Sequence, residues 1–136
     1  MALCFPFEVY TPERRFFFEQ VQAVVLTLLD GEAAIYANNF SFTAPVIPCF
    51  LKIKAADGVW KTAFISEGIL EVNSRKTILV SDAAEWPSEI DYERAKAAKQ
   101  RAEEIIMEGM LKFEKESAKS ALRRANMRLR VKEEAV

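Results

Sequence analysis

Residues 78–104 read ILVSDAAEWPSEIDYERAKAAKQRAEE, and the chain changes its character within this stretch. Before Pro87 the residues are mostly apolar and β-branched, as in a buried strand, whereas after it alanine recurs every three or four residues, as on one face of a helix. The stretch therefore predicts two domains, a β-domain over residues 1–86 and a helical domain over residues 87–136.

Downstream of Pro87 the sequence predicts two helices. Ser88 is the expected cap of the first, because Asp91 three residues later gives a variant of the capping box, and this helix should end near Met107. After a turn from Gly109 to Lys112, the segment FEKESAKSALRRANMRLRV forms the second helix. Small and apolar residues recur at helical spacing in both: Ala95, Ala98, Ala102, Ile105 or Ile106, and Gly109, then Ala118, Ala121, Leu122, Ala125 and Leu129.

These stripes predict an antiparallel hairpin with close approach of the two backbones. Alanine side chains bury little area, so at about 25 cal/mol per Å² the seam contributes only a few kcal/mol against the entropy of ordering two helices. The hairpin should therefore open, or leave the β-domain, at modest cost.

Upstream of Pro87, short apolar segments alternate with turn sequences such as LLDGE and AADGVW about every ten residues. This rhythm is typical of an antiparallel β-sandwich or barrel, and with the helices it gives an α+β fold of about ten strands and a hairpin. VQAVVLTLL, residues 21–29, is apolar on both faces, so this strand is either buried on both sides or presents an interface. The run Phe16 to Phe18 should be partly buried, with one ring left for a partner.

Composition excludes several classes of function. The 136 residues are 51% hydrophobic and 29% charged, which fits one folded domain, or a domain with a small appendage. A net charge of -1 gives no global field for nucleic acid. The first 86 residues hold seven basic and ten acidic side chains, whereas the remainder hold twelve and ten, which favours two modules.

Histidine is absent, which removes the usual general base and the commonest metal ligand, so neither an enzyme nor a metal site is expected. Cys4 and Cys49 lie in apolar runs without paired spacing and should be buried, reduced thiols. No apolar run approaches the roughly 18 residues of a membrane span, and the start lacks signal-peptide features. The chain should stay in the cytoplasm or attach to a membrane complex through protein contacts.

Arginines flank both alanine stripes. Arg94 and Arg101 are seven residues apart and so fall within about 20° of each other on a helix, while Arg124 and Arg128 are four apart. A folded hairpin would bring all four around one groove, and the guanidinium fork suits phosphate. The alternative is a solvated helix flank without a ligand.

Several segments together resemble the epsilon subunits of bacterial F-type ATP synthases, the counterparts of the mitochondrial delta subunit. FEVYTPER is similar to the family's opening strand and turn, LLDGEAAIY to its Gly-Glu loop, ISEGILEV to its glycine-containing strand pair, and ALRRANMRLRV to its closing helix. ILVSDAAE joined to IDYERA is the most specific piece. The resemblance covers nearly the whole chain.

This resemblance implies a β-sandwich that sits on the rotor beside the gamma subunit and the c-ring, without catalytic activity of its own. The helical domain would extend into the alpha/beta catalytic head to block ATP hydrolysis, and folding of the hairpin would release that block. The expected location is the cytoplasmic face of the bacterial membrane, with attachment only through the complex.

The resemblance also implies ATP as a regulatory ligand of the folded hairpin, with no catalytic cofactor. The matching positions are Glu85, Ile90, Asp91, Arg94, Ala95, Arg101, Arg124 and Arg128. The arginines would neutralise the phosphates, while the acidic groups would hold the sugar or the adenine amino group. Alternatively, the same arginines would bind acidic surfaces of the catalytic head.

Two regions depart from the family pattern. The expected contacts with the c-ring are Gly31, Glu32, Asn38 and Asn39. Because Ala37, Asn38 and Asn39 replace the family's Pro-Gly-His-like turn, the resemblance does not determine the form of these contacts. Glu67 stands where the family usually has a glycine, either on a surface bulge or at a point of close approach.

A rival reading is a free-standing nucleotide sensor or adaptor of the same fold, which would be a soluble monomer without affinity for gamma. An enzyme is the third reading, because no pair of nucleophile and base can be assembled from the chain.

Overall fold

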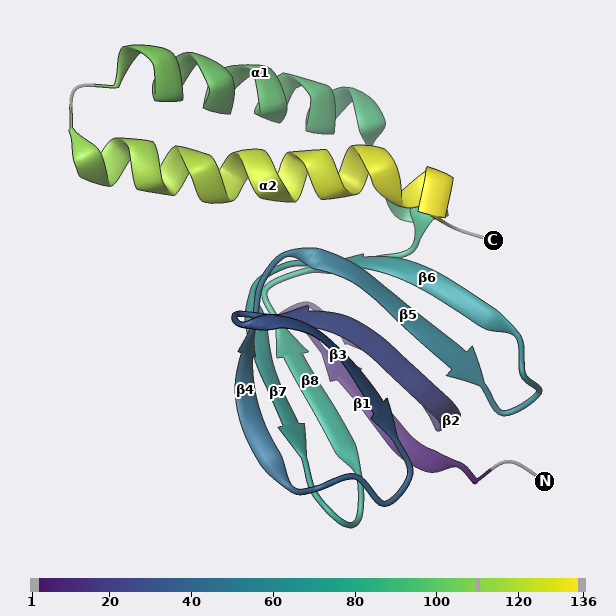
Figure 1. Ribbon diagram of the computed structural model, residues 1–136. Coiled ribbons are helices and arrows are strands. Elements are labelled where there is room, and N and C mark those ends of the chain that lie inside the picture. The colour runs from purple at the N-terminus through teal and green to yellow at the C-terminus, as the bar shows by residue number, and fades with distance from the viewer. Residues whose placement is uncertain (1–2, 110, 135–136) are drawn as a thin grey trace.

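The computed structural model describes residues 3–109 and 111–134, which form a β-sandwich and a helical hairpin (Figure 1). Within these residues the chain forms nine strands, a short 3₁₀ helix and two α-helices. The strands are β1 (Phe5–Tyr10), β2 (Arg15–Leu28), β3 (Gly31–Tyr36), β4 (Phe42–Val46), β5 (Cys49–Ala55), β6 (Trp60–Ile65), β7 (Gly68–Val72), β8 (Thr77–Ser81) and β9 (Ala84–Glu85). The helices are η1 (Pro87–Glu89), α1 (Tyr92–Glu108) and α2 (Lys112–Glu134).

The long strand β2 connects the two layers of the sandwich. Its first half pairs with β1, and its second half pairs with β3 and β5. The strand order β1-β8-β7-β4 then forms one layer, while β5, β6 and β9 continue the other (Figure 1). All strand pairs are antiparallel except β1 with β8, which is parallel because β8 returns beside the first strand of the chain.

The core fills the space between the layers with side chains at alternate positions. Phe7, Val24, Leu51, Leu70 and Leu79 are completely buried and come from five different strands. This alternation arises because successive side chains of a strand point to opposite faces. The strand predicted at residues 21–29 is indeed central.

The outer positions of that central strand are only half-buried, as at Val25 and Thr27. Val21, Ala23 and Val24 are all buried because the register shifts between Val21 and Ala23 where β2 pairs with β5. Of the three phenylalanines that begin β2, Phe16 and Phe17 are buried and Phe18 is 52% exposed, as expected for that run.

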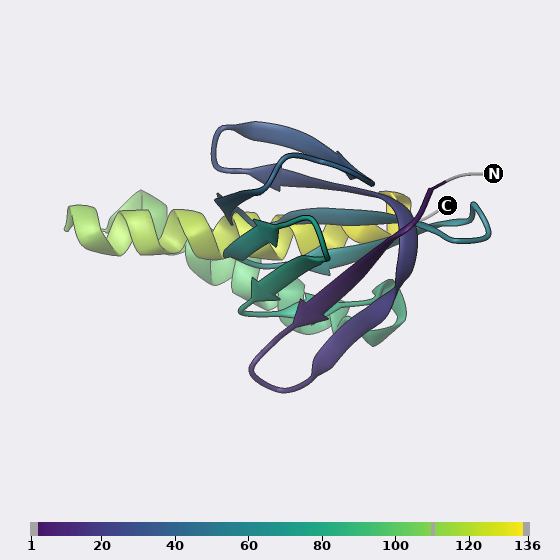
Figure 2. The same cartoon turned by 90° about the horizontal axis from the view of Figure 1, so that it is seen from below.

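The hairpin closes through alanine, as its sequence pattern predicts. Ala95 and Ala102 of α1 and Ala118 and Ala125 of α2 are buried. Only α2 packs on the sandwich to any extent, against β5 and β6, so α1 is held mainly by α2 (Figure 1). The turn end of the hairpin projects beyond the strands (Figure 2).

A small hydrophobic cluster attaches α2 to the sandwich. The linker between β9 and α1 comprises residues 86–91. The buried members of the cluster are Phe64 of β6, Ile90 of this linker and Val131 of α2, and we refer to these three as the docking cluster. Phe50, Tyr92 and Met127 pack around it, half-buried. The cluster is separate from the core of the sandwich, so the hairpin can leave without opening that core.

Two predictions from the sequence are wrong. The cap of α1 is Asp91, not Ser88, because Asp91 Oδ1 accepts a hydrogen bond from the backbone N–H of Arg94 at 3.0 Å, while Ser88 lies inside η1. Cys4 is exposed, because it precedes β1 and its alternation of buried side chains, whereas Cys49 is buried. Both thiols are free.

In the described part of the chain, neither helix combines the length and apolar character that crossing a bilayer requires.

Candidate functional site

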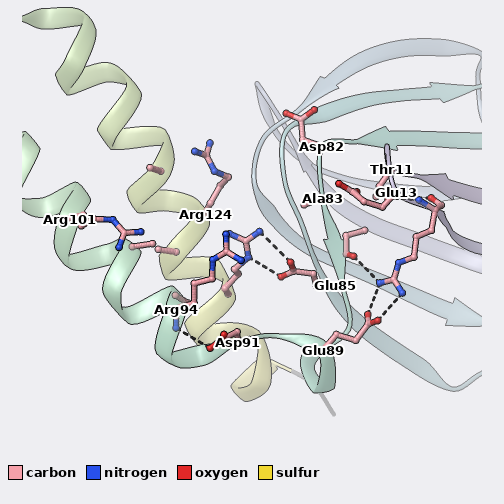
Figure 3. A pocket seen from close by; sticks show the side chains of 17 residues that line it. Thr11, Glu13, Asp82, Ala83, Glu85, Glu89, Asp91, Arg94, Arg101 and Arg124 are labelled. Atoms are coloured by element: carbon pink, nitrogen blue, oxygen red, sulfur yellow. Dashed lines mark hydrogen bonds and ion pairs between the residues drawn. The ribbon is translucent and has the colours of Figure 1, made fainter.

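The predicted arginines meet in one cavity between the hairpin and the sandwich, which we call the arginine cavity (Figure 3). Its volume is about 660 Å³, within the range of small-molecule sites. The residues that line it are Thr11, Glu13, Arg14, Asp82, Ala83, Ala84, Glu85, Glu89, Asp91, Arg94, Ala95, Ala98, Arg101, Ala121, Arg124, Ala125 and Arg128. Alanines of the two helices keep the cavity floor open, and charged side chains form its walls.

Both helices contribute a pair of arginines. Arg94 and Arg101 of α1 make no ion pair with any residue that the structure describes. Arg124 and Arg128 of α2 are each paired with a carboxylate of the sandwich. Of the four helix arginines, two therefore have guanidinium groups that are available to an anion and two are already engaged.

Arg128 is fixed by both charge and packing. Its Nε and NH2 groups donate to the two carboxylate oxygens of Glu85, at 2.9 and 3.4 Å. Its guanidinium carbon also lies 4.5 Å from the centre of the Phe64 ring, within the docking cluster. The pair therefore joins α2 to β9, immediately before the linker.

Seven of the eight sequence-predicted nucleotide residues line the cavity, and Ile90 does not. Its side chain is buried in the docking cluster, where it holds the linker against β6 and α2. Asp91 uses one carboxylate oxygen as the cap of α1, which leaves the other oxygen for a ligand.

The turn between β1 and β2 adds residues that sequence reasoning missed. Arg14 donates from NH1 and NH2 to the two oxygens of Glu89, both at 2.8 Å, and also to the carbonyl of Ala84. Glu89 in turn accepts from the backbone N–H of Trp86, so Arg14 fastens the linker to the sandwich. The hydrogen bond from Arg14 is the main reason why the pKa of the Glu89 carboxyl lies below its usual value.

We expect Glu89→Gln to lower the free energy of unfolding by about 0.5–1 kcal/mol at neutral pH, the range for solvent-screened pairs. Because the folded-state pKa of Glu89 is lowered, this contribution is complete above the unfolded value of about 4.3 and is lost as pH falls through the folded pKa. Urea unfolding between about pH 7 and pH 2 measures it. Glu93→Gln, which removes an exposed pair with Lys96, is the control. A cost for Glu89→Gln that stays constant with pH would contradict the ion pair.

The predicted ring-contact residues fall into two places. Gly31 and Glu32 begin β3, whereas Asn38 and Asn39 follow its end, so the pairs lie at opposite ends of the strand. Asn38 has a φ of 63°, a left-handed conformation that asparagine tolerates better than most residues.

Known proteins match the chain along its length. The family model for the beta-sandwich domain of the ATP synthase delta/epsilon chain matches residues 4–87, and that for its long alpha-helix domain matches residues 88–133. The ATP synthase epsilon chain of Caldicellulosiruptor saccharolyticus is 45% identical over 96% of this chain and 94% of its own length. That of Caldanaerobacter subterraneus is 43% identical over 96% and 95%.

A solved structure has the same fold. A chain in the cryo-EM structure of the Euglena gracilis mitochondrial ATP synthase, comprising OSCP, F1 and the c-ring, superposes with a TM-score of 0.79 at 18% identity. The match covers 93% of this chain and 79% of that one. With both domains matched in order and relatives above 40% identity, the chain belongs to the delta/epsilon family of ATP synthase chains.

Proposed function

We propose that the chain is a non-catalytic subunit of the rotor of an F-type ATP synthase, where it links the gamma subunit and the c-ring to the catalytic head. The relatives named ATP synthase epsilon chain support this assembly, because they match over almost the whole length of both chains. In this proposal the chain lies at the cytoplasmic face of the bacterial membrane and is held there by its partners.

The outer face of the sandwich offers a surface for gamma. Phe18, Ile69 and Val80 are about half exposed and lie on neighbouring strands of the same face, since Ile69 pairs with Val80 and Phe18 pairs with Glu8 of β1. Exposed apolar side chains that share a face mark a protein interface more often than a solvated surface. We assign this face to gamma.

The arginine cavity supports ATP as the regulatory ligand. It is the observation that carries this proposal: four arginines from two helices, with Glu85 opposite, surround a space of the size of a small ligand. Phosphates are recognised by such guanidinium groups through paired hydrogen bonds. In this proposal the acidic residues of the sandwich wall bind the sugar hydroxyls or the adenine amino group.

Binding would depend on the folded hairpin, because the site exists only while α1 and α2 lie together. ATP would then stabilise the folded hairpin by mass action, and its loss would allow the helices to extend and inhibit hydrolysis. The thin alanine seam and the small docking cluster keep the two states within a few kcal/mol.

Calorimetric titration of ATP into the isolated chain tests the site. We expect saturable binding that the double variant Arg94→Ala, Arg124→Ala weakens about a hundredfold or more, because each arginine supplies charged hydrogen bonds worth about 1.5–3 kcal/mol. Arg75→Ala with Lys61→Ala is the control, since it removes the same number of positive charges at positions that do not line the cavity.

Absence of binding up to millimolar ATP would contradict the regulatory site and leave the arginines as a docking surface for the head. Co-purification separates the rotor subunit from a free-standing sensor: the rotor subunit stays with gamma and the ATPase complex, whereas a free-standing protein does not.

A further inference from the structure

Glu67 belongs to neither helix and does not line the arginine cavity, but its carboxylate pairs with Arg124, which does. Glu67 lies in the turn between β6 and β7. Its Oε2 accepts a hydrogen bond from NH1 of Arg124 at 2.8 Å, and its Oε1 accepts one from the Ser66 hydroxyl. The two side chains of the ion pair are about one-third exposed, so solvent screens them only in part.

The position of Glu67 is well fixed by the sheet. Its backbone carbonyl accepts from the N–H of Asp82, and the neighbouring Gly68 begins β7 in register with Ser81 of β8. Burial alone would raise the pKa of Glu67, but the hydrogen bonds from Ser66 and its own backbone, together with Arg124, hold the pKa below its usual value. The carboxylate is therefore charged and aimed at Arg124 at neutral pH.

The sandwich thus provides one carboxylate for each α2 arginine of the cavity. Glu67 holds Arg124 and Glu85 holds Arg128, and the two arginines are one helical turn apart. In contrast, the α1 arginines, Arg94 and Arg101, have no such partner among the described residues. An anion that enters the cavity meets the α1 arginines without a competing carboxylate, whereas at Arg124 it competes with Glu67 for the NH1 group.

We propose that Glu67 acts as a tethered competitor of the nucleotide phosphates for Arg124 and so raises the ATP concentration at which the hairpin responds. This inference rests on the proposed ATP site. A tethered carboxylate is always present at the arginine, so a phosphate that takes the NH1 group of Arg124 must exchange with it and gains at that group only the difference between the two pairings.

Glu67 also fastens the empty hairpin to the sandwich. Together with Arg128–Glu85 and the hydrogen bond from Arg123 to the carbonyl of Pro48 at 2.7 Å, it keeps α2 docked without any ligand. The Glu67 side chain therefore makes docking of the hairpin less dependent on ATP and also weakens the binding of ATP. Both effects make this subunit less sensitive to ATP.

The test is calorimetric titration of ATP into four forms of the full chain: wild type, Glu67→Gln, Arg124→Ala and the double variant. We expect Glu67→Gln to lower the Kd by about threefold to fivefold, the equivalent of a partly exposed ion pair. In the Arg124→Ala background the same change should have no effect, because the competitor then has nothing to hold. Glu71→Gln is the control, since it removes an exposed carboxylate from the next strand, away from the cavity.

Hydrogen exchange of α2 gives the docked fraction of each form, by which the measured Kd values are corrected. An unchanged Kd in Glu67→Gln, or an equal gain with and without Arg124, would overturn the competitor while leaving the ATP site in place. No binding by either wild type or Glu67→Gln at millimolar ATP would overturn the ATP site and this inference together.

Discussion

Gly68→Ala is expected to lower the free energy of unfolding of the sandwich by about 3 kcal/mol, the upper range for forcing atoms into a packed structure. A Cβ built on Gly68 would lie 2.1 Å from the carbonyl oxygen of Val80 and 2.9 Å from the Cα of Ser81. Both atoms belong to the backbone of β8, which pairs with β7 along its whole length. The clash can be relieved only by moving one strand away from the other.

Gly58→Ala is the matched control for this substitution. Gly58 has a φ of 87°, but nothing lies within 4 Å of the Cβ that alanine would add. Its cost is limited to backbone strain, about 1–2 kcal/mol. Urea unfolding followed by near-ultraviolet circular dichroism compares the two variants, and equal losses of stability would contradict the steric explanation.

Val131→Asp is expected to release the hairpin from the sandwich while the sandwich stays folded. Val131 is completely buried in the docking cluster, and an unpaired charge at such a place costs about 3–5 kcal/mol. Because Val131 is one of only three buried members of the docking cluster, the substitution removes a large part of the apolar contribution to docking in addition to this cost.

Hydrogen exchange measures this release. In Val131→Asp the amides of α1 and α2 should lose protection, whereas those of β2, β5 and β8 should keep it. Val59→Asp is the control, because the same residue is changed to the same charge at a position 55% exposed. If the proposed function is correct, the variant also binds ATP poorly and inhibits hydrolysis more strongly. Protection of the helices at the wild-type level would contradict the role of the docking cluster.

The fold could be predicted from local patterns because its elements repeat their own period. Short apolar segments between regularly spaced turn sequences predicted the strands, and alanines at three-four spacing, such as Ala95 and Ala102, predicted the seam of the hairpin. The exact start of α1 could not be predicted, because Ser88 and Asp91 both suit a cap. The choice between them depends on Glu89, which is held by Arg14 from the other end of the chain.

Most of the site residues that could be predicted from the sequence lie on the two helices. Helical spacing placed the arginines, but their partners lie far along the sequence: Glu67 is 57 residues from Arg124, and Arg14 is 75 from Glu89. No local pattern links such residues, because the sheet topology brings them together. The exposure of Cys4 could not be predicted for a related reason, since its apolar neighbours belong to a strand that begins only after it.

The alanine seam of the hairpin also has a thermal consequence. The heat-capacity change of a conformational transition follows the apolar surface that it exposes. Parting α1 from α2 exposes mainly the methyl groups of Ala95, Ala102, Ala118 and Ala125, whereas unfolding the sandwich exposes large side chains such as Phe7 and Leu79. The free energy of separating the two helices therefore changes with temperature along a nearly straight line, whereas the stability of the sandwich follows a strongly curved one, so cooling does not weaken this seam in the way that it weakens a large apolar core.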